Sequence, residues 1–383
     1  MIRLAWSLVA LAISTAGAED RCPAGGSWPD TDWPSAAQVV RSARPAEAAA
    51  LDAYAFTPAG PEASRRGIRT DGLLVVQRGV VTYERYGRGF GPATPHLAWS
   101  VAKSVTGALA AVAVGAGALS MDDSICKHLP AAPRWTCDIS VRDLLESASG
   151  LDWNERYEGG ALQDSSVLAM LYGQGRRDMV SFVLSHRRRA GPGEQWRYSS
   201  ADAVLLAAVA DRAMVSHDAE ADWPFQRLFQ PLGMASAVFE RDAAGSLVGS
   251  SYFYATPRDL ARLGWLFLED GCWRGREILP AGWMGMARQV SAPFRMPGEP
   301  RRRRDGAWGR DLWLNRAVPE VGLEKPWPGA PDDAFAARGH WGQEVVVIPS
   351  LEMVVVRTGD DREAGALDLG KLVSLAVAAG RLP

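Results

Sequence analysis

Residues 96–117 read HLAWSVAKSVTGALAAVAVGAG, and the part from Val101 to Val114 is apolar on nearly all sides if it is helical. A helix without a polar face has to be buried, because it has no side to offer to water. Gly115 and Gly117 predict its end. The stretch therefore predicts a buried helix that begins beside Ser100.

The segments on either side of this helix predict strands. Residues 72–86 form two β-type runs around an Arg-Gly turn, which is the pattern of a hairpin. Near the end of the chain, residues 344–348 and 351–357 predict two more strands, and a last helix follows from about residue 368 to 379. The region between has helical patterning, including a capped start at Ser140, an apolar run over 201–213 and a Thr256-Pro257 helix start.

This order predicts an α+β fold, an antiparallel sheet flanked by helices with an inserted helical lobe. We expect residues 19–115 and 248–383 to form the sheet domain and residues 116–247 to form the helical lobe.

The N-terminus has the pattern of a signal peptide. Arg3 precedes an apolar run over residues 4–13, and Ala16-Gly17-Ala18 offers small residues for cleavage after residue 18. An uncleaved N-terminal anchor helix is the alternative. No later segment reaches the about 20 apolar residues that a membrane span needs. We therefore expect a periplasmic or secreted protein.

Export favours disulfide formation, and the four cysteines can pair in three ways. Cys126 and Cys137 are close in sequence and bracket a turn, so we expect this pair. Cys22 and Cys272 then remain for each other.

Composition excludes several classes of partner. The net charge of −2 argues against nucleic acid, and the basic run 301–304 is typical of a solvated loop. The cysteines lack CxxC spacing and the five histidines are scattered, so we expect no metal site. No cofactor is implied.

Lysine is rare in this chain, which makes each lysine informative. Only four of the 42 cationic residues are lysines, and an amine can lose its proton near neutral pH whereas a guanidinium cannot. Lys103 lies three residues after Ser100, on the same face of the predicted buried helix. Burial would lower the pKa of Lys103 and make it a base for Ser100. The alternative is a helix cap followed by a surface lysine.

Three segments together resemble the signature boxes of class C β-lactamases and their relatives, which include D-alanyl-D-alanine carboxypeptidases, esterases and 6-aminohexanoate-oligomer hydrolases. The segments are Ser100-Val101-Ala102-Lys103, Tyr198-Ser199-Ser200 and Gly339-His340-Trp341-Gly342-Gln343. The resemblance covers roughly residues 70–380 and implies a β-lactamase/transpeptidase-like fold. It looks closest to the aminohexanoate-hydrolase and esterase branch.

The resemblance implies a role for each matching position. Ser100 would be the nucleophile, Lys103 its base, and Tyr198 the group that exchanges protons with Ser100 and the leaving group. The backbone N–H groups of Ser100 and His340 would form the oxyanion hole. The predicted substrate-binding residues are Ser200, which stands where relatives often have Asn, with Gly339 and Trp341.

The third box departs from the family pattern of Lys-Thr-Gly. Aligning its glycine with Gly339 places Ala337 and Arg338 at the other two positions. A second register takes His340-Trp341-Gly342 as the triplet and moves the oxyanion donor to Gln343. Both registers remove the lysine that holds a β-lactam or peptide carboxylate, which argues against antibiotic hydrolysis.

The sequence therefore predicts a serine hydrolase that cleaves a small ester, amide or peptide-like substrate through an acyl-enzyme on Ser100. Two alternatives stay open at this point. One is a β-lactamase or D-alanyl-D-alanine carboxypeptidase, and the other is a non-catalytic relative that binds cell-wall peptide or a partner. Trp99, Trp153 and Trp341 flank the boxes and could line an acyl pocket or simply pack in the core.

Overall fold

The computed structural model describes residues 21–22, 28–158, 164–217, 219–298 and 305–382. The predicted signal peptide (1–18) and the basic run 301–304 lie outside these residues. Among the residues that are described, no helix has the length and apolar character to cross a bilayer.

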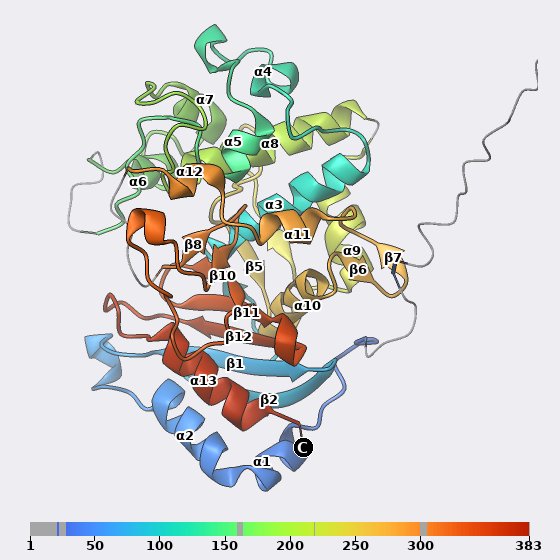
Figure 1. Ribbon diagram of the computed structural model, residues 1–383, viewed down its shortest axis with the longest axis vertical. Coiled ribbons are helices and arrows are strands. Elements are labelled where there is room, and N and C mark those ends of the chain that lie inside the picture. The colour runs from blue at the N-terminus through green and yellow to red at the C-terminus, as the bar shows by residue number, and fades with distance from the viewer. Residues whose placement is uncertain (1–20, 23–27, 159–163, 218, 299–304, 383) are drawn as a thin grey trace, which may run out of the picture.

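A seven-stranded antiparallel sheet runs from the middle of the molecule downward in Figure 1, from β8 to β2, in the order β2-β1-β12-β11-β10-β9-β8. The predicted hairpin is present as β1 and β2, and its turn residues Arg78 and Gly79 both have positive φ. The C-terminal strand pair lies directly beside β1, so the two ends of the chain share one sheet. The strands are β1 (Thr70–Gln77), β2 (Val80–Tyr86), β8 (Ala307–Trp308), β9 (Trp313–Leu314), β10 (Phe335–Gly339), β11 (Gln343–Ile348) and β12 (Met353–Gly359).

Helices cover both faces of this sheet. On the outer face lie α1 (Ala37–Ala43), α2 (Pro45–Phe56) and α13 (Leu369–Gly380), as Figure 1 shows. On the inner face lies α10 (Pro257–Leu268), which Thr256 caps and Pro257 opens, as the sequence predicts. Gly264 lets α10 approach the sheet closely, because a Cβ there would lie 2.6 Å from a methyl group of Val354.

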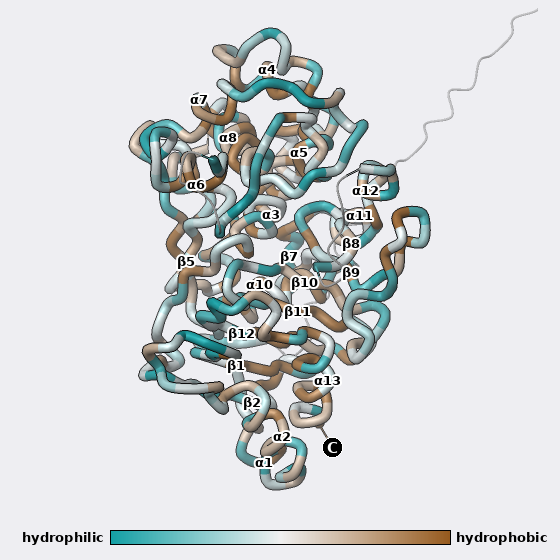
Figure 2. The backbone as a smooth tube through the Cα atoms, turned by 90° about the vertical axis from the view of Figure 1, so that its left-hand side faces the viewer, coloured by the Kyte–Doolittle hydropathy of each residue, from teal (hydrophilic) through white to brown (hydrophobic). Residues whose placement is uncertain are grey.

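The upper half of the molecule is helical. Its centre is formed by α3 (Val101–Gly115) and α8 (Ser200–Ser216), which pack against each other. Figure 2 shows hydrophobic residues concentrated in the strands and inner helices and hydrophilic residues in the outer loops. The smaller elements are α4 (Ile125–His128), α5 (Val141–Leu145), α6 (Ser166–Leu171), α7 (Met179–Leu184), α9 (Gln230–Leu232), α11 (Trp283–Ala287), α12 (Ala292–Arg295), β3 (His96–Leu97), β4 (Val238–Phe239), β5 (Phe253–Ala255), β6 (Cys272–Trp273) and β7 (Arg276–Glu277).

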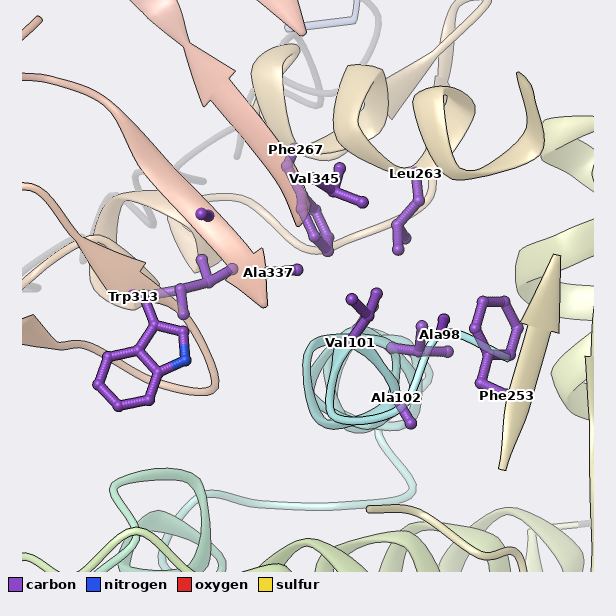
Figure 3. Packing of buried hydrophobic residues seen from close by; sticks show 14 of the residues in the cluster. Ala98, Val101, Ala102, Phe253, Leu263, Phe267, Trp313, Ala337 and Val345 are labelled. Atoms are coloured by element: carbon purple, nitrogen blue, oxygen red, sulfur yellow. The ribbon is translucent and has the colours of Figure 1, made fainter. Parts of the chain in front are cut away.

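Helix α3 packs against α8 on one side and against β10 and β11 of the sheet on the other, so the prediction of a buried helix is confirmed. Every residue from Val101 to Ala113 is buried. Figure 3 shows Val101 directed toward Leu263 of α10 and Val345 of β11. Burial of apolar side chains on several sides of the helix therefore fixes the position of its N-terminus, where Ser100 lies.

Both expected disulfides are present. Cys126 pairs with Cys137 across 11 positions of sequence, and Cys22 pairs with Cys272 across 250. Paired cysteines are typical of proteins that fold in an oxidising compartment, which is consistent with export.

Candidate active site

The N-terminal end of α3 opens into a cavity of about 900 Å³. Its lining includes Ser100, Tyr198, Gly339 and His340, so residues from all three predicted boxes meet there. Ser100 is the residue that precedes α3, and Trp99 before it has a φ of 49°. This left-handed turn between β3 and α3 directs the chain sharply into the helix and leaves Ser100 at the cavity floor.

Lys103 lies one helical turn below Ser100 and is almost wholly buried, with 1% of its surface exposed. Its Nζ is 3.1 Å from Ser100 Oγ, 3.0 Å from Ser200 Oγ and 3.3 Å from the carbonyl oxygen of Ser250. Burial lowers the pKa of Lys103, although the negative charge of Glu155 opposes this. The alternative of a solvated surface lysine is therefore wrong.

Tyr198 lies two residues before α8 and interacts with both Ser100 and Lys103. The Nζ of Lys103 lies over its ring, 4.7 Å from the centroid. Burial and the charge of Glu155 raise the pKa of Tyr198, while a hydrogen bond with Ser100 acts in the opposite direction. Trp308 and Trp313 pack on the ring, with centroids at 5.5 Å and 5.3 Å. The phenol is thus held in place and keeps its proton near neutral pH.

Strand β10 lines the cavity with Arg338 and Gly339, and it ends at Gly339, which pairs with Gln343. A Cβ on Gly339 would lie only 2.2 Å from the carbonyl oxygen of Ala98. The strand therefore carries Ala337, Arg338 and Gly339 in sequence order beside the Ser100 segment, while His340 lies in the turn. The oxyanion role of the His340 N–H stays a prediction.

The side chain of Arg338 is hydrogen-bonded to other groups of the protein. Its Nε lies 2.9 Å from Glu344 Oε2, and its Nη1 donates to the carbonyl oxygen of Asp305 at 2.8 Å. Glu344 is 3% exposed, so the guanidinium charge is largely neutralised inside the protein. At the second position of the third box, where relatives usually have Thr, this chain therefore has an arginine whose charge is balanced by Glu344.

The aromatic residues of the third box stack on neighbours at the cavity edge. His340 stacks on Tyr157 at 4.7 Å, and its Nε2 is 3.6 Å from Glu158 Oε1. Burial lowers the pKa of His340 to about 4. Trp341 packs on Trp99 at 5.1 Å, and the guanidinium of Arg362 covers its ring at 3.1 Å. A substrate contact from Trp341 stays a prediction.

Sequence reasoning missed Glu155, which lines the cavity beside Ser200. Its Oε1 accepts the Ser200 hydroxyl proton at 2.5 Å, and its Oε2 accepts from the Ser200 N–H at 2.9 Å and from Trp153 Nε1 at 2.6 Å. Ser200, predicted to bind substrate, therefore bridges Glu155 and Lys103. Glu155 lies in a loop 45 positions before Ser200, and no local pattern marks such a distant partner.

Comparison with known proteins assigns the family. The sequence profile of the family described as Beta-lactamase matches residues 45–370. The chain belongs to the beta-lactamase family. Within it, the 6-aminohexanoate-dimer hydrolase of Paenarthrobacter ureafaciens is 28% identical over 340 residues, which cover 85% of this chain and 81% of that protein.

Solved structures share the fold at low sequence identity. A penicillin-binding protein homologue from Caulobacter crescentus has a TM-score of 0.61 at 17% identity, covering 88% of this chain and 96% of its own. EstCE1, a hydrolase with promiscuous acyltransferase activity, has a TM-score of 0.63 at 16% identity, covering 89% and 99%. The predicted α+β, β-lactamase/transpeptidase-like fold is therefore confirmed.

Proposed function

We propose that this member of the beta-lactamase family hydrolyses an ester or amide through an acyl-enzyme on Ser100. The observation that carries the proposal is the position of Lys103, whose buried Nζ lies 3.1 Å from Ser100 Oγ. A buried amine next to a serine hydroxyl at a helix N-terminus can act as its base without a histidine.

The proposed reaction has two halves. Ser100 Oγ attacks the substrate carbonyl and its proton passes to Lys103. The backbone N–H groups of Ser100 and His340 stabilise the oxyanion. As the tetrahedral intermediate collapses, Tyr198 gives its proton to the leaving alcohol or amine and regains one from Lys103. Water then attacks the acyl-enzyme, and its proton returns to Ser100 by the same groups in reverse.

The third box gives a substrate carboxylate no lysine of the kind that other members of the family carry there. Arg338, the one cationic residue in the third box, is paired with Glu344. The relative from Paenarthrobacter ureafaciens is named for hydrolysis of an amide, and one neighbour in structure is a family VIII carboxylesterase. Linear amides and simple esters are therefore the substrates we propose, in the periplasm or outside the cell.

Labelling with a fluorophosphonate probe tests the nucleophile directly. We expect the probe to map to Ser100, p-nitrophenyl esters to give a burst of product, and Ser100→Ala to abolish both. Ser104→Ala is the matched control, because Ser104 lies in the same helix and donates to the carbonyl oxygen of Asp311. We expect little turnover of nitrocefin. If Ser100→Ala keeps full activity on every ester tested, the proposal is wrong.

A further inference from the structure

The three neighbours of the Lys103 amine are not equivalent. The Ser250 carbonyl oxygen, 3.3 Å away, can only accept a proton. The Ser200 hydroxyl, 3.0 Å away, gives its own proton to Glu155 and is therefore also restricted to accepting from Lys103. Ser100 Oγ, at 3.1 Å, is the remaining neighbour, and it can either accept or donate.

A neutral amine has two N–H bonds and one lone pair. With both N–H bonds directed to Ser200 and Ser250, the lone pair faces Ser100. This is the orientation that a base for Ser100 requires. If the Ser200 hydroxyl instead donated to Lys103, the lone pair would be occupied there and Lys103 would have to donate to Ser100.

Three hydrogen bonds hold the Glu155 carboxylate, which accepts the hydroxyl proton of Ser200. Glu155 accepts from the N–H of Ser200 and from Trp153 Nε1 on one oxygen, and from the hydroxyl of Ser200 on the other. Its side chain is 14% exposed, and Oε1 lies 3.9 Å from the Nζ of Lys103. The carboxylate can therefore act on the amine both by its charge and through the Ser200 hydroxyl, which is hydrogen-bonded to both groups.

We infer that Glu155 is a positioning residue, which fixes the direction of the Ser200 hydroxyl proton and thereby turns the lone pair of Lys103 toward Ser100. The inference rests on the proposed function of Ser100 and Lys103. It goes beyond it by assigning Ser200 and Glu155 to the orientation of the base rather than to the substrate.

We expect replacement of Glu155 by Gln to reverse the direction in which the Ser200 hydroxyl donates its proton. Two N–H donors, from Ser200 and Trp153, converge on Oε2, so the amide oxygen of Gln has to take that position. The amide NH₂ then faces the Ser200 oxygen and donates to it. The Ser200 proton is left to point at Lys103, which occupies the lone pair.

The decisive experiment measures kcat/KM against pH on a p-nitrophenyl ester for wild type, Glu155→Gln, Ser200→Ala and the double variant. We expect Glu155→Gln to lower the pH-independent plateau about 100-fold, within the range for losing a general base. Adding Ser200→Ala removes the misdirected hydroxyl and is expected to restore activity about 10-fold over Glu155→Gln. Ser200→Ala alone removes one acceptor of the Lys103 N–H bonds but places no proton at the lone pair, and we expect it to lose about 10-fold.

A purely electrostatic role gives a different result. The charged and titratable groups that act on Lys103 are Glu155, Asp311 in the turn after β8, Asp202 in α8 and the phenol of Tyr198. If Glu155 acted only by its charge, Glu155→Gln would move the acid limb of the profile to lower pH and leave the plateau unchanged. That outcome overturns the inference.

A purely structural role is also distinguishable. If the double variant is no more active than Glu155→Gln, the hydroxyl direction is irrelevant and the inference is wrong. Thermal unfolding of each variant checks folding, and Glu47→Gln on the exposed surface of α2 is the matched control for loss of a carboxylate. Ser100→Ala separates the two proposals, because its failure to abolish activity would refute the nucleophile itself.

Discussion

Adding one methyl group at Gly339 should separate β10 from the segment that carries Ser100. A Cβ there would lie 2.2 Å from the carbonyl oxygen of Ala98 and 3.0 Å from the Cβ of Gln343. Ala98 is two residues before Ser100, and its carbonyl accepts the N–H of Val101 at 3.2 Å, so it does not move independently of α3. Ordinary contact begins at 3.4 Å, and the strand would have to retreat by about 1.2 Å.

A displacement of this size acts on the reaction more than on the fold. The predicted oxyanion donor, the N–H of His340, follows Gly339 directly and would retreat with it. A misplacement of about 1 Å costs on the order of 100-fold in rate. Overpacking of a tight contact costs about 1–3 kcal/mol of unfolding free energy. We therefore expect Gly339→Ala to fold, to unfold at a lower urea concentration and to lose about 100-fold in kcat/KM.

The assay combines ester hydrolysis, the rate of fluorophosphonate labelling and urea unfolding. Gly285→Ala in α11 is the matched control, because a Cβ there has nothing within 4 Å and alanine favours a helix. If Gly339→Ala and the Gly285→Ala control both keep the kcat/KM of the wild type, the approach of β10 to Ala98 does not control the position of the oxyanion donor.

Two further predictions concern stability. Removing Cys22–Cys272 should cost about 5 kcal/mol and removing Cys126–Cys137 about 3 kcal/mol, because the first closes a loop of 250 positions and the second one of 11. Urea unfolding of the paired Cys→Ser variants measures both, and equal costs would contradict the loop-closure argument. His340 should make the protein less stable in acid. Its pKa falls from 6.5 to about 4 on folding, so the unfolded chain takes up the proton first and stability is lost as pH falls through this window, by about 3 kcal/mol at most. His340→Phe should therefore lose less stability than wild type between pH 7.5 and 4.5, and equal losses would exclude His340 as the source.

Local patterns were sufficient for the elements whose burial is decided within the element itself. The apolar run over 101–114 could only be a buried helix, and the strand runs around Arg78-Gly79 could pair with each other without help from the rest of the chain. Helices α1 and α2 were not predicted. Helix α2 has no strong amphipathic pattern, and the two helices are held mainly by β2, in the case of α1, and by α13, in the case of α2.

The residues of the candidate site also fall into those that local sequence patterns could place and those that they could not. Ser100 directly precedes the helix that carries Lys103, so spacing alone predicted that the two side chains are neighbours, and Nζ and Oγ lie 3.1 Å apart. Tyr198 could be matched only through its resemblance to a known box. Glu155 has no such box, and its link to Lys103 runs through a serine on another element, which sequence spacing does not encode.

The sequence by itself determined that a serine and a lysine stand on one face of a helix with no polar surface, because helical periodicity and burial act over a few residues. Only the tertiary structure decided which hydrogen-bonding groups surround that pair. The acceptors around Lys103 come from Glu155, through Ser200, and from Ser250, and the approach of β10 to the Ser100 segment depends on Gly339. Packing between segments far apart in the chain sets all of these positions.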